Sequence, residues 1–228
     1  MTVTTKLVLK DMPATGLVGV GGDGWVGDGD LDILVEATGT SAPHEALSVN
    51  ATKSQFTVTK GTNGTFVFVP NNVDDNMITT KDVERVVFTD KGLALDVDGP
   101  AGELYALLSA ALGQSDVNAG LMGVGLALQD TGMTDVQLAE VLLNSSVYKA
   151  DAMGTSNETF VKQVYTNVTG SAISLADLTL FTGLLDRKEI TQAQLLDAAS
   201  NLVAFRDTTH INLIGLADTG IEYIPFAL

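Results

Sequence analysis

A repeat in the second half of the chain most limits the folds that this sequence can adopt. Residues 104–148 align without gaps on residues 161–205, at a constant offset of 57. Thr134-Asp-Val-Gln137 then falls on Thr191-Gln-Ala-Gln194. Thr-x-x-Gln is a capping box, in which the hydroxyl accepts one free helix N–H and the amide reaches back to another. The repeated start predicts two copies of a three-helix unit and a terminal helix near residues 207–220. The alternative is chance alignment of Leu- and Ala-rich helices.

The first helix of this half is marked by its own signals. Pro100 suits a first helical turn, where its missing N–H costs nothing. Apolar residues then follow at the spacing of a buried helical stripe. Gly113 marks the expected end of the helix. The stripe consists of Leu104, Leu107, Leu108 and Ala111.

Before residue 99 the sequence alternates as strands do and is rich in Val, Thr, Gly and Asp. Residues 55–60 and 65–69 flank Asn63-Gly64, which is a strong hairpin signal. Residues 83–89 and 93–97 predict a second hairpin, joined by Asp90-Lys-Gly92. We expect much of the core of this half to come from Phe56, Phe66, Phe68, Val87 and Phe88, on one face of the sheet or on two.

The sequence therefore predicts an α+β protein with two domains. Residues 1–98 would form an antiparallel β domain, and residues 99–228 an all-α domain of two tandem three-helix repeats plus a terminal helix. Exposed strand edges tend to pair with other chains. We therefore assign docking or oligomerisation to the β domain and display to the helical domain.

Composition excludes several classes of function. The 228 residues include 12 Lys and Arg against 28 Asp and Glu, a formal net charge of −16. Such a chain repels phosphate backbones and anionic lipid, so we expect neither nucleic acid partners nor membrane insertion. With 45% hydrophobic and 18% charged residues it can build a core. The absence of cysteine excludes disulfides, thiol catalysis and cysteine-ligated metal sites.

Two routes out of the cell are compatible with the sequence. Residues 1–10 contain no apolar segment of the length that a secretory signal needs. We therefore expect either a one-step exporter that reads the C-terminus, which the apolar ending at residues 224–228 fits, or assembly onto a phage-like particle that is released by lysis. Localisation at the cell surface, outside the cell or on a virion follows from this expectation.

Three segments together resemble a known bacterial family. Residues 83–105 begin Val83-Glu-Arg85 and end Gly102-Glu-Leu-Tyr105, residues 157–170 run from Asn157-Glu-Thr-Phe160 to Gly170, and Gly220-Ile-Glu-Tyr223 closes the pattern. This combination resembles the bacterial domains of unknown function of family 4214, over about residues 80–228. The resemblance implies an all-helical module, usually joined to β-rich, calcium-binding or surface-layer-type exported proteins, and supplies no catalytic residues.

A Gly/Asp-rich loop offers a candidate metal site. Residues 22–33 resemble one degraded calcium repeat of the secreted RTX type, with Asp23, Asp28, Asp30 and Asp32 as candidate ligands. Alternating carboxylates with glycine turns can surround a hard cation with oxygen atoms. The alternative is an acidic turn that leads into a strand. Trp25, in the same loop, is the aromatic residue that we expect to be exposed and able to bind a sugar ring.

Catalytic signals are weak throughout the chain. The two histidines, His44 and His210, lie in different halves and have no nucleophile motif beside them. Asp74-Asp75 and the pair Asp96 and Asp98 could be acid/base groups, but carboxylates in solvated turns are far commoner. We therefore predict a protein that is not an enzyme.

The function predicted from sequence is attachment or assembly. The chain would be a structural protein on the outside of a bacterium or a phage-like particle, forming a homo-oligomer or larger assembly and contacting glycan or cell envelope. The alternatives are a spike, fibre or decoration protein of a phage or gene transfer agent, and a carbohydrate-active hydrolase that uses paired carboxylates.

Overall fold

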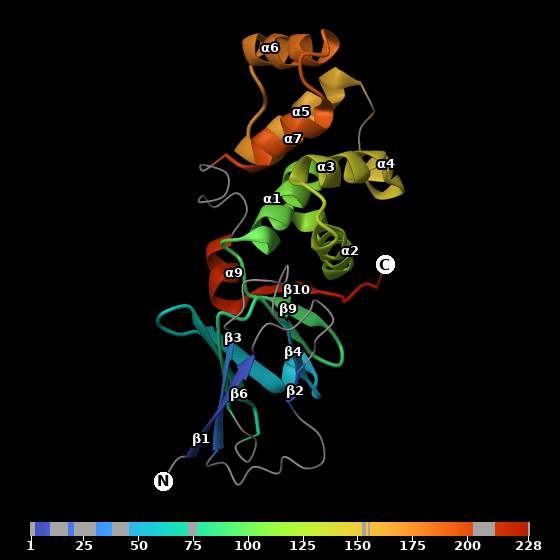
Figure 1. Ribbon diagram of the computed structural model, residues 1–228. Helices are drawn as coiled ribbons and strands as arrows, with labels where there is room; N and C mark the ends of the chain where they lie inside the picture. Colours follow the sequence, from blue (N-terminus) through green and yellow to red (C-terminus); the bar gives the residue numbers. More distant parts are fainter. Residues whose placement is uncertain are drawn as a thin grey trace. The chain divides into compact units, whose positions relative to one another are not determined.

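The computed structural model describes residues 3–9, 18–20, 31–37, 46–72, 77–151, 154, 156–202 and 213–227, with the backbone alone for the three strands before residue 46. The chain is α+β, as predicted, with strands in the N-terminal part and helices after them (Figure 1). It divides into two compact units, residues 1–97 with 215–227, and residues 98–214 with 228. Each unit is described by itself.

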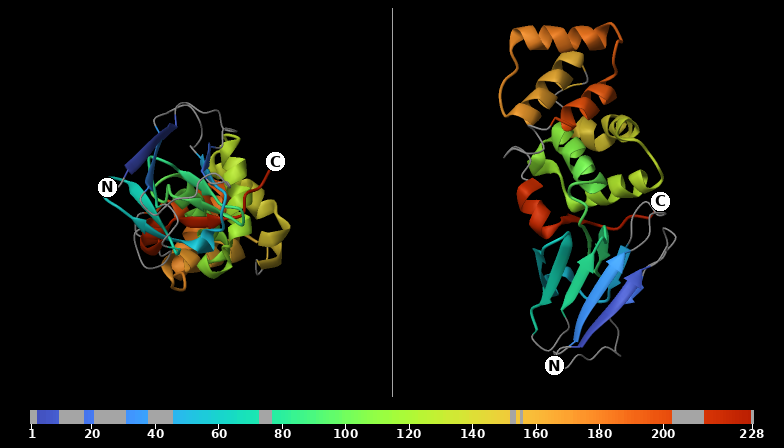
Figure 2. Two further views of the ribbon diagram at one scale, coloured as in Figure 1. Left: turned by 90° about the horizontal axis from the view of Figure 1, so that it is seen from below. Right: turned by 60° about the vertical axis from the view of Figure 1, so that its left-hand side comes forward.

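The first unit contains two five-stranded sheets. One has the order β1-β3-β7-β6-β5, and the other β10-β9-β8-β4-β2. Several strands of the first sheet are seen side by side in the right-hand view of Figure 2. The strands are β1 (Val3–Leu9), β2 (Val18–Val20), β3 (Leu31–Ala37), β4 (Ala46–Val49), β5 (Phe56–Lys60), β6 (Thr65–Pro70), β7 (Ile78–Lys81), β8 (Arg85–Val87), β9 (Gly92–Ala94) and β10 (Ile221–Tyr223).

The prediction of an antiparallel β domain is wrong in part, because both sheets are mixed. β1 pairs with β3, β3 with β7, β2 with β4 and β4 with β8 in parallel. The first four strands alternate between the two sheets, so a strand of one sheet connects two strands of the other. Such a connection provides the crossover that parallel neighbours require. Strand alternation in the sequence cannot reveal this exchange.

Both predicted hairpins are confirmed. β5 and β6 pair antiparallel, and Thr65 N–H donates to Thr62 O at 3.3 Å across the turn. Asn63 and Gly64, between them, have φ values of 57° and 74°. Positive φ at both central residues is the pattern of a type I′ turn, which matches the twist of the strands. β8 and β9 form the second antiparallel hairpin.

The core of the first unit includes residues from both sheets. Phe66, Phe68 and Phe88 are buried, as predicted, and the Phe68 and Phe88 ring centroids lie 6.0 Å apart. Phe56 is half-buried beside them. The prediction of Val87 as a core residue is wrong, since Val86 is fully buried and Val87 only half-buried. Successive strand side chains face opposite sides, so a one-residue error in register exchanges them.

The C-terminal segment completes the second sheet, whereas the sequence analysis placed it in the helical domain. β10 pairs antiparallel with β9, with Tyr223 opposite Gly92. A Cβ atom at Gly92 would lie 2.2 Å from the Tyr223 ring, so the ring occupies the space that a larger residue would fill. Lys91 Nζ donates to Glu222 Oε2 at 2.8 Å. Of the predicted terminal helix, the structure describes α9 (Leu213–Thr219).

The second unit contains two sets of three helices, defined here as the first and second helix sets. The first is α1 (Pro100–Leu112), α2 (Ala119–Asp130) and α3 (Asp135–Asn144), followed by the short α4 (Ser146–Asp151). The second is α5 (Asn157–Thr169), α6 (Leu175–Asp186) and α7 (Gln192–Ser200). Two 3-10 turns complete the elements, η1 (Lys53–Gln55) and η2 (Gln114–Asp116).

The helix ends predicted from sequence are confirmed. Pro100 is the first residue of α1, and Gly113, with φ of 93°, follows its last. Thr134 and Gln137 form a complete capping box at α3, and Thr191 and Gln194 form another at α7. All four stripe residues of α1 are buried.

The two helix sets start their helices at nearly constant separations. α5 begins 57 residues after α1, and α7 begins 57 residues after α3. α6 begins 56 residues after α2, one fewer than a gapless alignment requires. α1 packs against α5 and α3 packs against α7, so corresponding helices lie beside each other.

Candidate binding grooves in the helical unit

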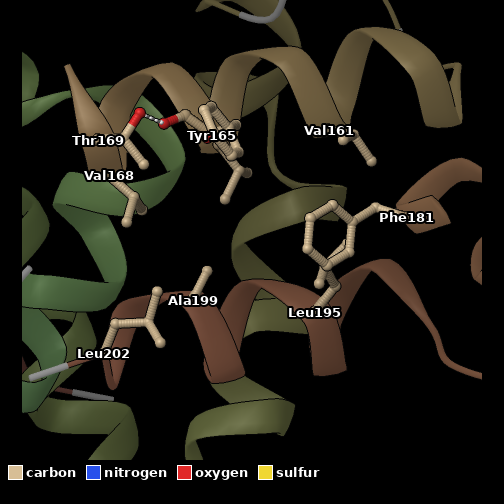
Figure 3. Close-up of a pocket in the computed structure, with 9 residues that line it drawn as sticks. Val161, Tyr165, Val168, Thr169, Phe181, Leu195, Ala199 and Leu202 are labelled. Carbon is tan, nitrogen blue, oxygen red and sulfur yellow. Dashed lines mark hydrogen bonds between the residues drawn. The ribbon is translucent and has the colours of Figure 1, made fainter. Parts of the chain in front are cut away.

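Each helix set encloses an apolar hollow between its helices. The first groove, of about 210 Å³, lies between α1, α2, α3 and α4. The second groove, of about 120 Å³, lies between α5, α6 and α7 (Figure 3). The first is lined by Leu104, Leu107, Leu108, Leu121, Val124, Gly125, Leu128, Leu138, Val141, Leu142, Ser145 and Val147. The second is lined by Val161, Val164, Tyr165, Val168, Thr169, Phe181, Leu195, Ala199 and Leu202.

The two grooves occupy the same place in the two sets. Leu104 of α1 and Val161 of α5 are each the fifth residue of their helix, and both line a groove. Six pairs of lining residues are related in this way at an offset of 57. The pairs are 104 and 161, 107 and 164, 108 and 165, 138 and 195, 142 and 199, and 145 and 202.

Both grooves reach the surface through aliphatic side chains. Val141 and Val147 of the first groove are each 44% exposed, and Leu202 of the second is 51% exposed. In the second groove the Phe181 ring points from α6 toward Leu195 and Val161 (Figure 3). Apolar hollows that are partly open to water gain free energy when another apolar group displaces that water.

The hydroxyl groups of Ser145 and Thr169 already bond within the chain. Thr169 Oγ1 donates to Tyr165 O at 2.8 Å. Ser145 Oγ donates to Leu142 O at 2.6 Å and accepts from Tyr148 N–H at 3.1 Å. No carboxylate, imidazole or amine is among the lining residues of either groove. The grooves are therefore suited to apolar contact and carry no acid/base pair.

The structure tests the candidate site residues only in part. Asp23, Asp28, Asp30 and Trp25 lie outside the described residues, and for Asp32 the backbone of β3 alone is described. Among the residues that the structure describes, no group of three His, Asp or Glu side chains could hold a metal ion. The calcium site and the exposed Trp25 remain predictions.

The candidate acid/base residues are similarly placed. His44, His210, Asp74 and Asp75 also lie outside the described residues. Asp96 forms an ion pair with Arg85, and the two side chains are 11% and 3% exposed. Because one partner removed from a buried pair leaves an uncompensated charge, this contact stabilises the sheet region and accounts for Asp96 structurally.

Shifted pKa values occur in two ion pairs on the surface. The hydrogen bond to Glu222 and its negative charge raise the pKa of Lys91. The hydrogen bond from Arg187 lowers the pKa of Glu189, and the same bond raises the pKa of Arg187. Neither pair lines a groove.

The grooves were not predicted from the sequence, although α2 and α6 carried a signal. No charged residue occurs from Ala119 to Gln129 in α2, or between Asp177 and Asp186 in α6. A helix that is apolar on every side normally packs on more than one side. None of the helices in the described part of the chain is long and apolar enough to cross a membrane.

Comparison of the chain with protein-family models, curated proteins and solved structures found no match. The resemblance to family 4214 therefore remains a prediction, and function is argued here from the residues and their geometry.

Proposed function

We propose that this protein is a non-enzymatic attachment protein whose helical unit binds an amphipathic helix of another protein. The observation that carries this proposal is the pair of apolar grooves at corresponding places in the two helix sets. Helix-in-groove binding needs an apolar hollow between helices and exposed apolar rims, and both grooves have them.

The helical unit is, in this proposal, a duplication of one three-helix module. The matching caps, the separations of 57, 56 and 57 residues, and the six related pairs of lining residues support it. Two related grooves give a partner two contacts, and linked contacts raise affinity through effective concentration.

The charge of the unit indicates the kind of helix that fits. Acidic residues outnumber basic ones more than twofold between Asp98 and Ile214. A partner helix with leucine-like residues on one face and lysine or arginine on the other would complement both the grooves and this field. The aliphatic linings favour protein over glycan as the partner, because sugar rings need hydrogen-bonding groups that the grooves do not offer.

The place of this activity follows the sequence analysis. The partner would belong to the outside of a bacterium or to a phage-like particle, with the β unit as the anchored part. A virion decoration protein is the second candidate, since the same attachment would serve on a capsid. A carbohydrate-active hydrolase would need carboxylates around a cleft, and no groove described above supplies them.

Selection from a displayed library of helical peptides tests the proposal. We expect enrichment of amphipathic basic peptides that bind the whole protein. Ala199→Trp fills the second groove and Val147→Glu places a charge at the first, and each should weaken binding about tenfold, or ~1.4 kcal/mol. Their neighbours supply matched controls, Ala198→Trp and Ser146→Glu, which are exposed and line neither groove.

Two results would overturn the proposal. The first is a selection that enriches no peptide. The second is equal binding of the enriched peptides to groove variants and controls. Binding of glycans on an array, followed by their cleavage, would favour the hydrolase instead.

A further inference from the structure

The outer face of α6 is the largest apolar surface that the groove proposal leaves unused. This face is defined by Leu175, Ala176, Thr179, Leu180 and Gly183, which recur at helical spacing. Leu175 is 80% exposed and Leu180 is 54% exposed. In Figures 1 and 2, α6 lies on the side of α5 and α7 that is away from α1.

The second helix set does not need this face for its own packing. The opposite side of α6 carries Phe181, which lines the second groove, and Leu185, which is buried. α6 packs mainly against α5, whereas α2 packs against both α1 and α3. At the positions of Leu175 and Leu180, counted from the helix start, α2 has the smaller Ala119 and Val124.

We propose that the outer face of α6 binds the same face of a second copy of this chain. The two helices would run antiparallel about a two-fold axis near Leu180. A two-fold contact uses one self-complementary patch twice and closes at a dimer. Ala176 and Gly183 lie about one turn on either side of Leu180, so they leave room for the partner's Leu180 between the helices.

Charge favours a second copy over other occupants of this face. A chain of net charge −16 repels its own copies over most of its surface, and repels anionic lipid as well. The face carries no charged residue, so two copies can approach there. Asp177 lies in the first turn of α6, and Arg187 and Lys188 follow its last turn. In an antiparallel pair the acidic end of each helix faces the basic end of the other, and the helix dipoles oppose.

Mass measurement on the whole protein gives the first test. A single helix face is a small interface, so we expect a dimer that dissociates in the micromolar range. Sedimentation equilibrium from micromolar to near-millimolar concentration should show it. Leu180→Glu should raise the dissociation constant about 30-fold or more, as for a central interface residue. Val69→Glu is the matched control, because Val69 is 42% exposed on β6 in the other unit.

Cysteine cross-linking then identifies the face. The natural chain has no cysteine, so single-cysteine variants report one position each. Leu180→Cys places the two thiols next to the axis, and mild oxidation should give a disulfide-linked dimer. Leu175→Cys places them about five residues from the axis on opposite sides, some 15 Å apart along the helices. It should cross-link at least about tenfold more slowly, and Val69→Cys at the background rate.

Each outcome decides the proposal. A wild-type chain that stays monomeric at near-millimolar concentration overturns it. A dimer that survives Leu180→Glu, or in which Leu180→Cys cross-links no faster than Val69→Cys, also overturns it. Circular dichroism confirms that each variant keeps its helices. A monomeric chain would leave the groove proposal intact, because the grooves lie on other residues.

Discussion

The two helix sets begin and end their helices with the same signals, yet they fill the space between them differently. The seventh residue is Gly125 in α2 and Phe181 in α6. The facing residue of the first helix is Leu104 in one set and Val161 in the other. A Cβ atom at Gly125 would lie 2.7 Å from Leu104 Cδ1. The larger residue comes from the first helix in one set and from the second helix in the other.

This exchange of volume has a consequence for the surface. Gly125 allows α2 to approach α1 closely, and four residues of α2 are buried. Phe181 fills the corresponding space in the second set, and Leu185 is the buried residue of α6. Local capping thus specifies where helices start, while packing volume decides how much of each helix remains exposed.

Gly125→Phe would break this comparison most severely. It places the side chain of the second set in the first, against a Leu104 that is 2% exposed. Overpacking a filled core typically costs 1–3 kcal/mol, and this large change should cost about 3 kcal/mol or more. Urea denaturation followed by circular dichroism measures it. Gly125→Ala, as the milder variant, should cost about 1 kcal/mol, and a fully stable Gly125→Phe would show that α2 is not held by this contact.

A matched leucine pair sharpens the comparison. Leu138 and Leu195 are each the fourth residue of their helix, but Leu138 is 4% exposed and Leu195 half-buried. Leu138→Ala should cost about 3 kcal/mol, since truncating buried leucine costs 2–5 kcal/mol. Leu195→Ala should cost about half as much. Equal losses in urea denaturation would contradict the difference in packing.

The caps should behave alike in the two sets. Thr134→Ala and Thr191→Ala each remove the oxygen that accepts from the third backbone N–H of the helix, at 3.3 and 3.1 Å. Loss of such a cap costs about 1 kcal/mol. Thermal unfolding should therefore shift by similar amounts for both variants. A large inequality would mean that one cap also holds a tertiary contact.

The smallest expected effect is electrostatic and is confined to the second set. Arg187→Gln should raise the pKa of Glu189 toward its ordinary value, measured by NMR titration of the carboxyl carbon. Because the folded pKa is lowered, the pair stabilises the fold above the ordinary pKa of glutamate and loses this effect as pH falls through the folded pKa. An unchanged Glu189 titration would show that the contact is absent in solution.

Part of the fold was predictable because its signals act within a few residues. Asn63-Gly64 fixes a turn by backbone preference, and Pro100 and Gly113 limit α1. The choice between Val86 and Val87 failed because register depends on which face the opposing sheet covers. The grooves were missed because they arise where Leu104, Gly125 and Leu138, from three helices, fail to fill a space.

The sequence by itself therefore determined the α+β character, the two hairpins and the helix ends, since hydrogen bonds between near neighbours specify each of them. Only the tertiary structure decided the parallel strand pairs, the addition of β10 beside Gly92 and the different exposure of α2 and α6. Strand direction and packing volume depend on residues far apart in the chain, and their free energy is gained only when those residues meet.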